Sequence, residues 1–252
     1  MSLEGKVALV TGGSRGLGSV HCLTLAKAGS NVAVGGYSHF DKAEAIAKEI
    51  EALGRKAIAI KMDVADLNEV QLGVKKVEEA LGPINILVNN AAFGIVRAAT
   101  IINTDKKDWE RDLSVNLTGA FNTIKCCMSS MIESGWGRII NISSITGTMG
   151  GMGQCSYATT KAGLLGLTKT AALEGGRKGV TCNALVLGAI DGGSFYEVAP
   201  EFRERIVKRI AMRRAGDPQE ASNVLVFLAS EESSYINGEA IEISGGANLF
   251  TF

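Results

Sequence analysis

The sequence predicts an α/β fold: a doubly wound parallel sheet of about seven strands with helices on both faces. Short apolar, β-branched runs alternate with helical patterns along the 252 residues. Repeated βα units of this kind require right-handed crossovers and a parallel sheet that is covered on both sides. We find no linker, repeat or low-complexity segment, and therefore expect a single domain over residues 1–252.

The elements follow one another in a regular order. Residues 6–10 are predicted to form the first strand, and a helical pattern then runs to Gly29, an expected C-cap. Further strands are predicted at residues 31–34, 57–60, 84–88, 138–142, 180–185 and 240–243. Helices are predicted at residues 41–53, 66–81, 105–134, 157–178, 200–211 and 218–229, with Asp66 as an N-cap, a break near Gly119 and Gly179 as a C-cap.

The turn at residues 11–18 has the composition of a phosphate-binding loop. Gly12, Gly16 and Gly18 lie between a strand and a helix. Glycines let the backbone approach a pyrophosphate, and the N-terminus of the helix attracts its negative charge. The spacing is G-x-x-x-G-x-G rather than the more common G-x-G-x-x-G, so a purely structural loop is the alternative.

Tyr157 and Lys161 lie four residues apart in a predicted helix, with Ser144 upstream. This spacing places both side chains on one face of the helix. A phenol has a pKa near ~10, and we expect the ammonium of Lys161 to lower that pKa so that Tyr157 can act as an acid or base. Ser144 can polarise a substrate oxygen as a hydroxyl donor. By itself the pair also fits an ordinary surface contact.

Together these motifs resemble the classical short-chain dehydrogenase/reductase family, which has a Rossmann-type fold, over almost the full chain. Residues 11–18 match its T-G-x-x-x-G-x-G pattern, and residues 89–92 match its N-N-A-G pattern except at the last position. The sequence of the turn is most similar to that of the 3-oxoacyl-carrier-protein reductase type. The resemblance implies an oxidoreductase that transfers hydride between a nicotinamide cofactor and a carbonyl or secondary alcohol. Its implied catalytic residues are Asn116, Ser144, Tyr157 and Lys161.

The resemblance also implies roles for individual residues. Asn116 would hold a water molecule in a proton relay or bend its helix, and Asn90 would lie against the cofactor ribose. Asp63 would contact the adenine amino group, and Val64 would make a main-chain contact with the cofactor. A turn aspartate is the alternative for Asp63. The expected cofactor contacts are Gly12, Ser14, Arg15, Gly16, Leu17, Gly18, Tyr37, Ser38, His39, Asp63, Val64, Asn90, Tyr157, Lys161, Gly188 and Ile190.

NADP(H) is favoured over NAD(H) as the cofactor. Proteins that bind NAD usually place an acid after the second strand to accept the ribose 2′-hydroxyl, but here no acid occurs before Asp41. Arg15 could pair with a 2′-phosphate instead, and Tyr37, Ser38 and His39 could add contacts.

Three positions depart from the family pattern. Ala92 replaces a glycine, which is tolerated if φ is negative there. Leu187 replaces a proline, and Gly192 replaces a threonine that contacts the nicotinamide carboxamide in the family. This glycine puts the carboxamide contact in doubt and suggests a loop or lid that moves, at about residues 188–214.

The substrate is expected to be a small carbonyl or alcohol compound, with a 3-oxoacyl thioester linked to coenzyme A or a carrier as one option. The pocket is predicted from apolar residues, namely Phe93, Ile95, Ile145, Met149, Met152, Phe195, Tyr196, Phe202 and Met212. A basic stretch over residues 203–214 could bind phosphates or an acidic carrier, or simply face solvent. The alternatives are an NAD-dependent dehydrogenase of a cyclic or small secondary alcohol and a catalytically weak dinucleotide-binding partner subunit.

Composition bears on the expected partners, metal content and location of the protein. Basic and acidic residues balance at 26 each, which does not favour nucleic acid or a membrane as a partner. Five cysteines without metal spacing and only two histidines make a metal site improbable, and we expect a cytoplasmic protein. Apolar residues on the helices at 105–134 and 157–178, together with the tail at 246–252, predict a homotetramer. The helix residues are Ala120, Phe121, Ile124, Cys127, Met128, Leu164, Leu165, Leu167, Ala171 and Ala172.

Overall fold

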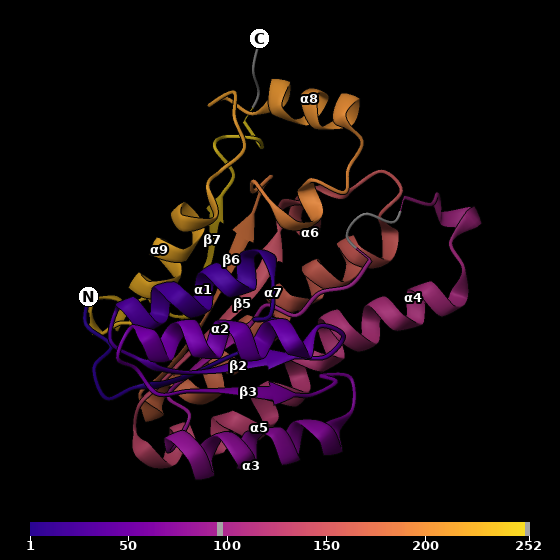
Figure 1. Cartoon of the computed structure of the whole chain (residues 1–252). Coiled ribbons are helices and arrows are strands. Elements are labelled where there is room, and N and C mark those ends of the chain that lie inside the picture. The colour runs from indigo at the N-terminus through magenta and orange to yellow at the C-terminus, as the bar shows by residue number, and fades with distance from the viewer. Residues whose placement is uncertain (95–97, 250–252) are drawn as a thin grey trace.

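A computed structural model describes residues 1–94 and 98–249. Within these residues, seven parallel strands form one sheet in the order β3-β2-β1-β4-β5-β6-β7 (Figure 1). The strands are β1 Val7–Val10, β2 Asn31–Gly36, β3 Ala57–Lys61, β4 Ile86–Asn89, β5 Gly137–Ser144, β6 Val180–Leu187 and β7 Ala240–Ile243. The order reverses between β1 and β4, so the carboxyl ends of these two strands flank a crevice suited to a ligand.

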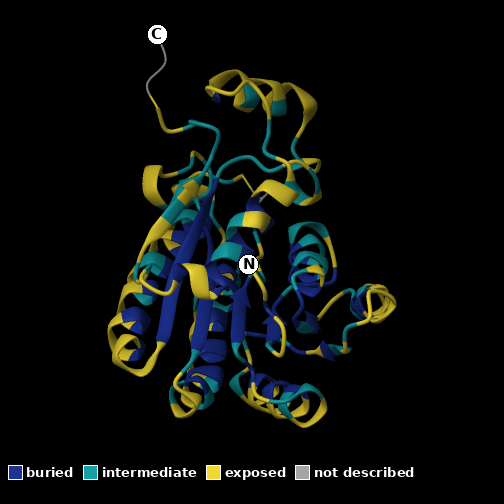
Figure 2. Cartoon of the chain, turned by 90° about the vertical axis from the view of Figure 1, so that its left-hand side faces the viewer, coloured by how far each residue is buried: buried dark blue, intermediate teal, exposed yellow. Residues whose placement is uncertain are grey.

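The helices cover both faces of the sheet, as predicted. They are α1 Gly16–Lys27, α2 Phe40–Ala52, α3 Leu67–Leu81, α4 Lys106–Leu113, α5 Gly119–Ser134, α6 Ile145–Met149, α7 Cys155–Gly175, α8 Pro200–Arg209 and α9 Pro218–Leu228. One core cluster joins the sheet to α1, α2 and α9, and a second joins it to α3, α5 and α7. Buried strands therefore lie between two helical layers whose outer faces are exposed (Figure 2).

The long helix expected at residues 105–134 is interrupted. Helix α4 ends at Leu113, a π-helical segment follows over Ser114–Thr118, and α5 begins at Gly119. The predicted break near Gly119 is therefore confirmed, although its geometry is that of a widened turn. Such π segments often occur at functional sites, and this one contains Asn116.

Two strands extend further toward the site than the sequence predicted. Strands β5 and β6 each extend two residues beyond their predicted ends, to Ser144 and Leu187. Paired main chain therefore carries both residues directly to the edge of the crevice. The expected N-cap is confirmed, because the Asp66 side chain accepts hydrogen bonds from the main chain of Asn68 and Glu69.

Most of the residues taken as an association surface are core residues instead. Ala120, Ile124, Cys127, Met128, Leu164, Ala171 and Ala172 are all buried within the chain's own interior. Ile124, Cys127, Met128, Ala171 and Ala172 belong to the core cluster in which α5 and α7 pack on the sheet. Of the original set, Phe121 is 48% exposed, and Leu173, which the sequence reasoning did not include, is 82% exposed. Residues 250–252 of the predicted tail contact lie outside the described residues.

Candidate active site

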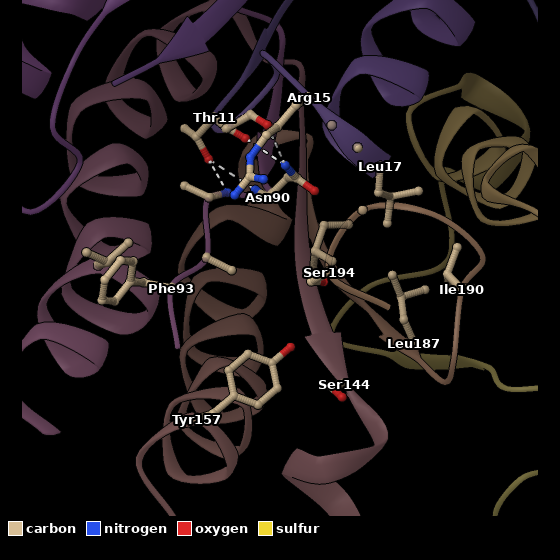
Figure 3. A pocket seen from close by; sticks show the side chains of 18 of the residues that line it. Thr11, Arg15, Leu17, Asn90, Phe93, Ser144, Tyr157, Leu187, Ile190 and Ser194 are labelled. Carbon is tan, nitrogen blue, oxygen red and sulfur yellow. Dashed lines mark hydrogen bonds between the residues drawn. The ribbon is translucent and has the colours of Figure 1, made fainter. Parts of the chain in front are cut away.

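A cavity of about 760 Å³ opens at the carboxyl ends of the strands. Its walls come from the turn after β1, the ends of β2 to β6, α7 and the segment after β6. Among its lining residues are all of the predicted cofactor contacts and, of the predicted catalytic residues, Ser144, Tyr157 and Lys161. Asn116 lies behind the wall and is 2% exposed. Figure 3 shows that Tyr157 and Arg15 reach this cavity from opposite ends.

The glycine turn leaves room for a ligand because its own backbone packs tightly. A Cβ atom on Gly18 would overlap the carbonyl oxygen of Gly12 and would lie 2.6 Å from Nδ2 of Asn90. Arg15, at the N-cap of α1, makes no side-chain capping bond, and the first turn of α1 contains no acid. The helix N-terminus can therefore offer its N–H groups to an anion, so the turn fits the pyrophosphate of a dinucleotide.

Thr11 and Asn90 lock this turn to the end of β4. The Thr11 hydroxyl accepts hydrogen bonds from the main-chain N–H groups of Asn90 and Ala91, each at 3.0 Å. The Asn90 amide donates at 3.0 Å to the carbonyl oxygens of both Thr11 and Gly12 (Figure 3). Asn90 therefore lines the cavity as predicted, but its side-chain nitrogen braces the glycine turn. Sequence reasoning missed Thr11, which precedes the glycines.

The residues after β2 that were expected to contact the cofactor line one end of the cavity. Tyr37, Ser38 and His39 follow β2 and line the wall there, without an acid among them. Arg15 lies at the same cavity and is paired with Glu197 at 3.5 Å, with both side chains about half exposed. This ion pair joins the phosphate-binding turn to the segment after β6, and no sequence pattern indicated it.

Asp63 and Val64 also lie where the sequence placed them, but both already have protein partners. Both guanidinium Nη atoms of Arg111 donate to Asp63 Oδ2 at 3.3 Å, and the N–H of Ala65 donates to Oδ1. The Val64 carbonyl oxygen accepts a hydrogen bond from Asn122. Arg111 lines the cavity beside them and was missed by sequence reasoning.

Asn116 holds the wall of the site rather than lining it. Its Oδ1 atom accepts from the N–H of Phe93 at 2.7 Å, and its Nδ2 atom donates to the carbonyl oxygen of Phe93 at 3.0 Å. Nδ2 also lies 3.3 Å from the hydroxyl of Thr160 on α7. These contacts support the structural alternative for Asn116, because its side chain ties the π segment to the Phe93 turn and to α7.

Ser144 ends β5 and faces the cavity with a proton available. Its oxygen accepts from the N–H and the hydroxyl of Thr146, at 3.2 and 3.1 Å. With the oxygen acting as an acceptor toward α6, the Ser144 O–H can donate toward the Tyr157 oxygen or toward a substrate oxygen. Ser143, its neighbour, is buried and donates to the carbonyl oxygen of Lys161 at 2.8 Å. The geometry therefore favours Ser144 over Ser143.

Burial governs the ionisation of Tyr157 and Lys161. Burial raises the pKa of Tyr157 to about 12, while its hydrogen bond to Ser144 acts in the opposite direction. Burial also lowers the pKa of Lys161 to about 8. The expected lowering of the Tyr157 pKa by Lys161 is not found, because desolvation of the phenolate is the larger effect. Lys161 Nζ donates to the carbonyl oxygen of Ile142 at 2.7 Å, which fixes its side chain.

The segment after β6 closes one side of the cavity. Gly188 and Ile190 line it, and Gly188 donates from its N–H to the carbonyl oxygen of Ile243 at 2.9 Å. Gly192 has a φ of +98°, a conformation that L-residues rarely adopt. The backbone conformation at position 192 therefore explains why glycine stands where the family has a threonine. Ala92 has no positive φ, so the condition for tolerating alanine there is met.

The predicted apolar pocket is only partly correct. Phe93, Ile145 and Phe195 line the cavity. Met149, Met152, Tyr196, Phe202 and Met212 are more than half exposed and do not line it, while Ile95 lies outside the described residues. Local patterns do not show how far an apolar residue lies from the reacting end. Helix α8 extends from the body of the protein, so its Phe202 stays exposed while Ile206 reaches the cavity (Figure 1). Val115, Val198 and Ile206 line the wall and were not predicted.

Comparison with known proteins identifies the family. The model of the short chain dehydrogenase family matches residues 6–201. The chain belongs to this family. It is therefore an oxidoreductase that acts on a CH–OH group or its carbonyl with NAD(P)(H).

The relatives of this short chain dehydrogenase match it over nearly its full length. It is 40% identical over 241 residues to 3-oxoacyl-acyl-carrier-protein reductase FabG of Staphylococcus aureus, which covers 96% of this chain and 97% of that protein. It is 41% identical over 243 residues to nodulation protein G of Azospirillum brasilense, covering 96% and 98%. A crystal structure from Agrobacterium tumefaciens, provisionally described as a gluconate dehydrogenase, has a TM-score of 0.94 at 32% identity and covers 99% and 98%.

Residues 1–94 and 98–249 contain no group of three or more His, Cys, Asp or Glu side chains arranged to hold a metal ion. None of the helices in that part of the chain is long and apolar enough to cross a membrane.

Proposed function

We propose that this enzyme is an NADPH-dependent reductase whose substrate is a 3-oxoacyl thioester. The observation that carries the proposal is the Tyr157 phenol beside Ser144 in the cavity, which burial keeps protonated by raising its pKa to about 12. At neutral pH the phenol then holds its proton and can donate it. Full-length similarity to 3-oxoacyl-acyl-carrier-protein reductases supports the substrate class.

In the proposed reaction, the chain positions the carbonyl and supplies the proton. The Ser144 hydroxyl donates a hydrogen bond to the carbonyl oxygen and so stabilises the negative charge that develops there. The Tyr157 Oη–H gives its proton to the same oxygen, leaving a phenolate. The nearby ammonium of Lys161 favours that anion. The nicotinamide cofactor, when bound, supplies the hydride.

The basic stretch supports a substrate whose carrier bears negative charge. Arg203, Arg205, Lys208 and Arg209 lie on α8, followed by Arg213 and Arg214. Lys208 and Arg214 pair with Glu204 and Glu220, which reduces the positive charge available for a partner. We propose that the rest faces the phosphates of coenzyme A or an acidic carrier protein.

The direct test is an activity panel that measures oxidation and reduction of the nicotinamide by absorbance. We expect the highest kcat/KM for an acetoacetyl thioester with NADPH, and lower values for simple ketones and sugar acids. If no thioester exceeds the small ketones, the substrate class is wrong. If no compound reacts while NADPH still binds, the chain is a catalytically weak dinucleotide-binding partner subunit.

A dehydrogenase of a small secondary alcohol is the second candidate. The structural neighbours favour it, because one is provisionally described as a gluconate dehydrogenase and another, from Sinorhizobium meliloti, as a short-chain alcohol dehydrogenase with a TM-score of 0.93 at 33% identity. In the same panel it predicts faster oxidation of gluconate or cyclic alcohols with NAD⁺ than reduction of the thioester.

Replacing Arg15 by alanine should weaken NADPH binding much more than NADH binding. A hydrogen-bonded charge pair of this type is worth about 1.5–3 kcal/mol, so we expect NADPH affinity to fall by about 10- to 100-fold. NADH affinity should stay within about twofold, because NADH carries no 2′-phosphate. Fluorescence titration of both cofactors measures this, with Arg177→Ala, an exposed residue of the turn after α7, as the control. Equal losses for both cofactors would mean that another group sets the preference.

We further propose that the enzyme is a homotetramer. The exposed Phe121 and Leu173 lie on α5 and α7, and the exposed face of α7 includes Gly166, beside which no atom lies within 4 Å. A second copy could therefore approach that face closely. Light scattering should give four times the 26.4 kDa chain mass. Leu173→Glu should weaken one contact and deletion of residues 249–252 the other, whereas a wild-type monomer at micromolar concentration would rule the assembly out.

A further inference from the structure

Asp112 is a buried carboxylate that neither the sequence motifs nor the reaction described above accounts for. It lies on α4, four residues before Asn116, and is 1% exposed. A buried carboxylate destabilises a protein unless its contacts compensate for the lost hydration. Here the hydroxyl of Ser156 donates to Asp112 Oδ2 at 2.5 Å. Ser156 is the residue directly before Tyr157 in α7.

Asp112 and Asn116 form two parallel contacts to the start of α7. Asp112 accepts from Ser156, and Asn116 donates to Thr160. Ser156 and Thr160 are four residues apart and stand on either side of Tyr157 in the sequence. The Thr160 hydroxyl also donates to the carbonyl oxygen of Tyr157 at 2.7 Å. The two contacts therefore hold the first turns of α7 on both sides of the proposed proton donor.

The same carboxylate packs closely against the turn that walls the cavity. Gly94 has a φ of +80°, and a Cβ atom there would lie 2.5 Å from one carboxylate oxygen of Asp112 and closer to the other. Gly94 follows Phe93, which lines the cavity and is held by Asn116. Asp112 therefore lies at the point where α4, the Phe93 turn and α7 meet.

The charge of Asp112 also suits this place. The first turn of α7 contains no acidic side chain of its own. A negative charge near a helix N-terminus is favourable, because it interacts with the unpaired N–H groups and the helix dipole. When ionised, Asp112 would bring that charge from another helix to the turn that contains Tyr157.

We propose that Asp112 is a positioning residue, which acts through Ser156 to hold the Tyr157 phenol in line with the substrate oxygen. This role rests on the proposed reaction, in which Tyr157 donates the proton. Displacement of a reacting group by about 1 Å can cost about 100-fold in rate. Loss of the contact should therefore lower kcat while leaving cofactor binding nearly unchanged.

The test compares Asp112→Ala, Ser156→Ala and Ser156→Thr with the wild type. We expect kcat to fall by about 100-fold in Asp112→Ala and about 10-fold in Ser156→Ala, with the NADPH dissociation constant within about twofold. Ser156→Thr keeps the hydroxyl and should retain most of the activity. The double alanine variant should be no slower than Asp112→Ala, because both changes remove one contact. Glu110→Ala, at an exposed acid of the same helix that pairs only at the surface with Lys106, is the control.

Hydrogen exchange provides a readout that does not need a substrate. Amides of residues 158–161, the first in α7 to donate to carbonyl oxygens one turn earlier, should exchange faster in Asp112→Ala and Ser156→Ala than in the wild type or in Ser156→Thr. Independent losses in the two alanine variants that multiply in the double variant, or unchanged exchange in this turn, would overturn the positioning role. If the wild type reduces no carbonyl compound, the proposed function fails, and the exchange result still decides whether Asp112 holds this turn.

Discussion

Tyr157→Phe is expected to abolish nearly all turnover, by about 10²- to 10⁴-fold, which is the usual contribution of a positioned acid or base. Phenylalanine keeps the ring in its buried place and removes only the oxygen that carries the proton. NADPH should therefore bind within about threefold of the wild-type affinity. Steady-state kinetics and fluorescence titration measure the two effects separately. Tyr235→Phe, which removes a fully exposed hydroxyl, is the matched control.

The pH dependence of the wild type should follow the ionisation of the same phenol. Because burial raises the pKa of Tyr157 to about 12, the protonated form persists through neutral pH, and reduction should not decline between about pH 7 and 9 for lack of this proton. Oxidation needs the phenolate, so its rate should rise about tenfold per pH unit up to about pH 8. Above that pH Lys161, whose pKa burial lowers to about 8, loses the charge that favours the phenolate, and the rise should flatten. A Tyr157→Phe enzyme with wild-type turnover, or oxidation that falls as pH rises, would contradict the assigned role.

The sequence predicted the fold well because the fold depends on local patterns. Apolar runs of strand length alternate with helical periodicity, and the glycine turn lies between β1 and α1 as its composition requires. The ends of β5 and β6 were predicted too early because Ser143 and Ser144 are polar and β6 continues past its β-branched start. The interrupted helix at Ser114–Thr118 was only partly foreseen, since a widened turn leaves no strong pattern in composition.

The contacts that tune the site could not be predicted from local patterns. Thr11 and Asn90 are 79 residues apart, and Ser156 and Asp112 are 44 apart, yet each pair is joined by a hydrogen bond. Motif matching finds the residues that face the cavity, and it does not show which buried polar groups support them. The same limit explains the apolar residues of α5 and α7, because a sequence does not reveal whether an apolar side chain faces its own sheet or a partner.

Gly18→Ala is expected to weaken the binding of both NADPH and NADH while leaving the catalytic residues in place. The added Cβ atom would overlap the carbonyl oxygen of Gly12 and crowd Asn90, and main chain cannot move aside as the end of a flexible side chain can. Overpacking of this kind costs about 1–3 kcal/mol or more, and the turn must distort to relieve it. We therefore expect NADPH and NADH affinities to fall together, by up to about 100-fold.

The matched control is Ser19→Ala, one position further along α1. Its hydroxyl donates only to the local carbonyl oxygen of Gly16, so its loss should change neither cofactor affinity nor the melting temperature by much. Titration of both cofactors, with circular dichroism to confirm folding, distinguishes the two variants. A folded Gly18→Ala protein that binds NADPH as tightly as the wild type would show that the cofactor does not depend on the close packing of this turn. A selective loss of NADPH alone would show that the variant acts through Arg15 instead, since only the 2′-phosphate differs between the two cofactors.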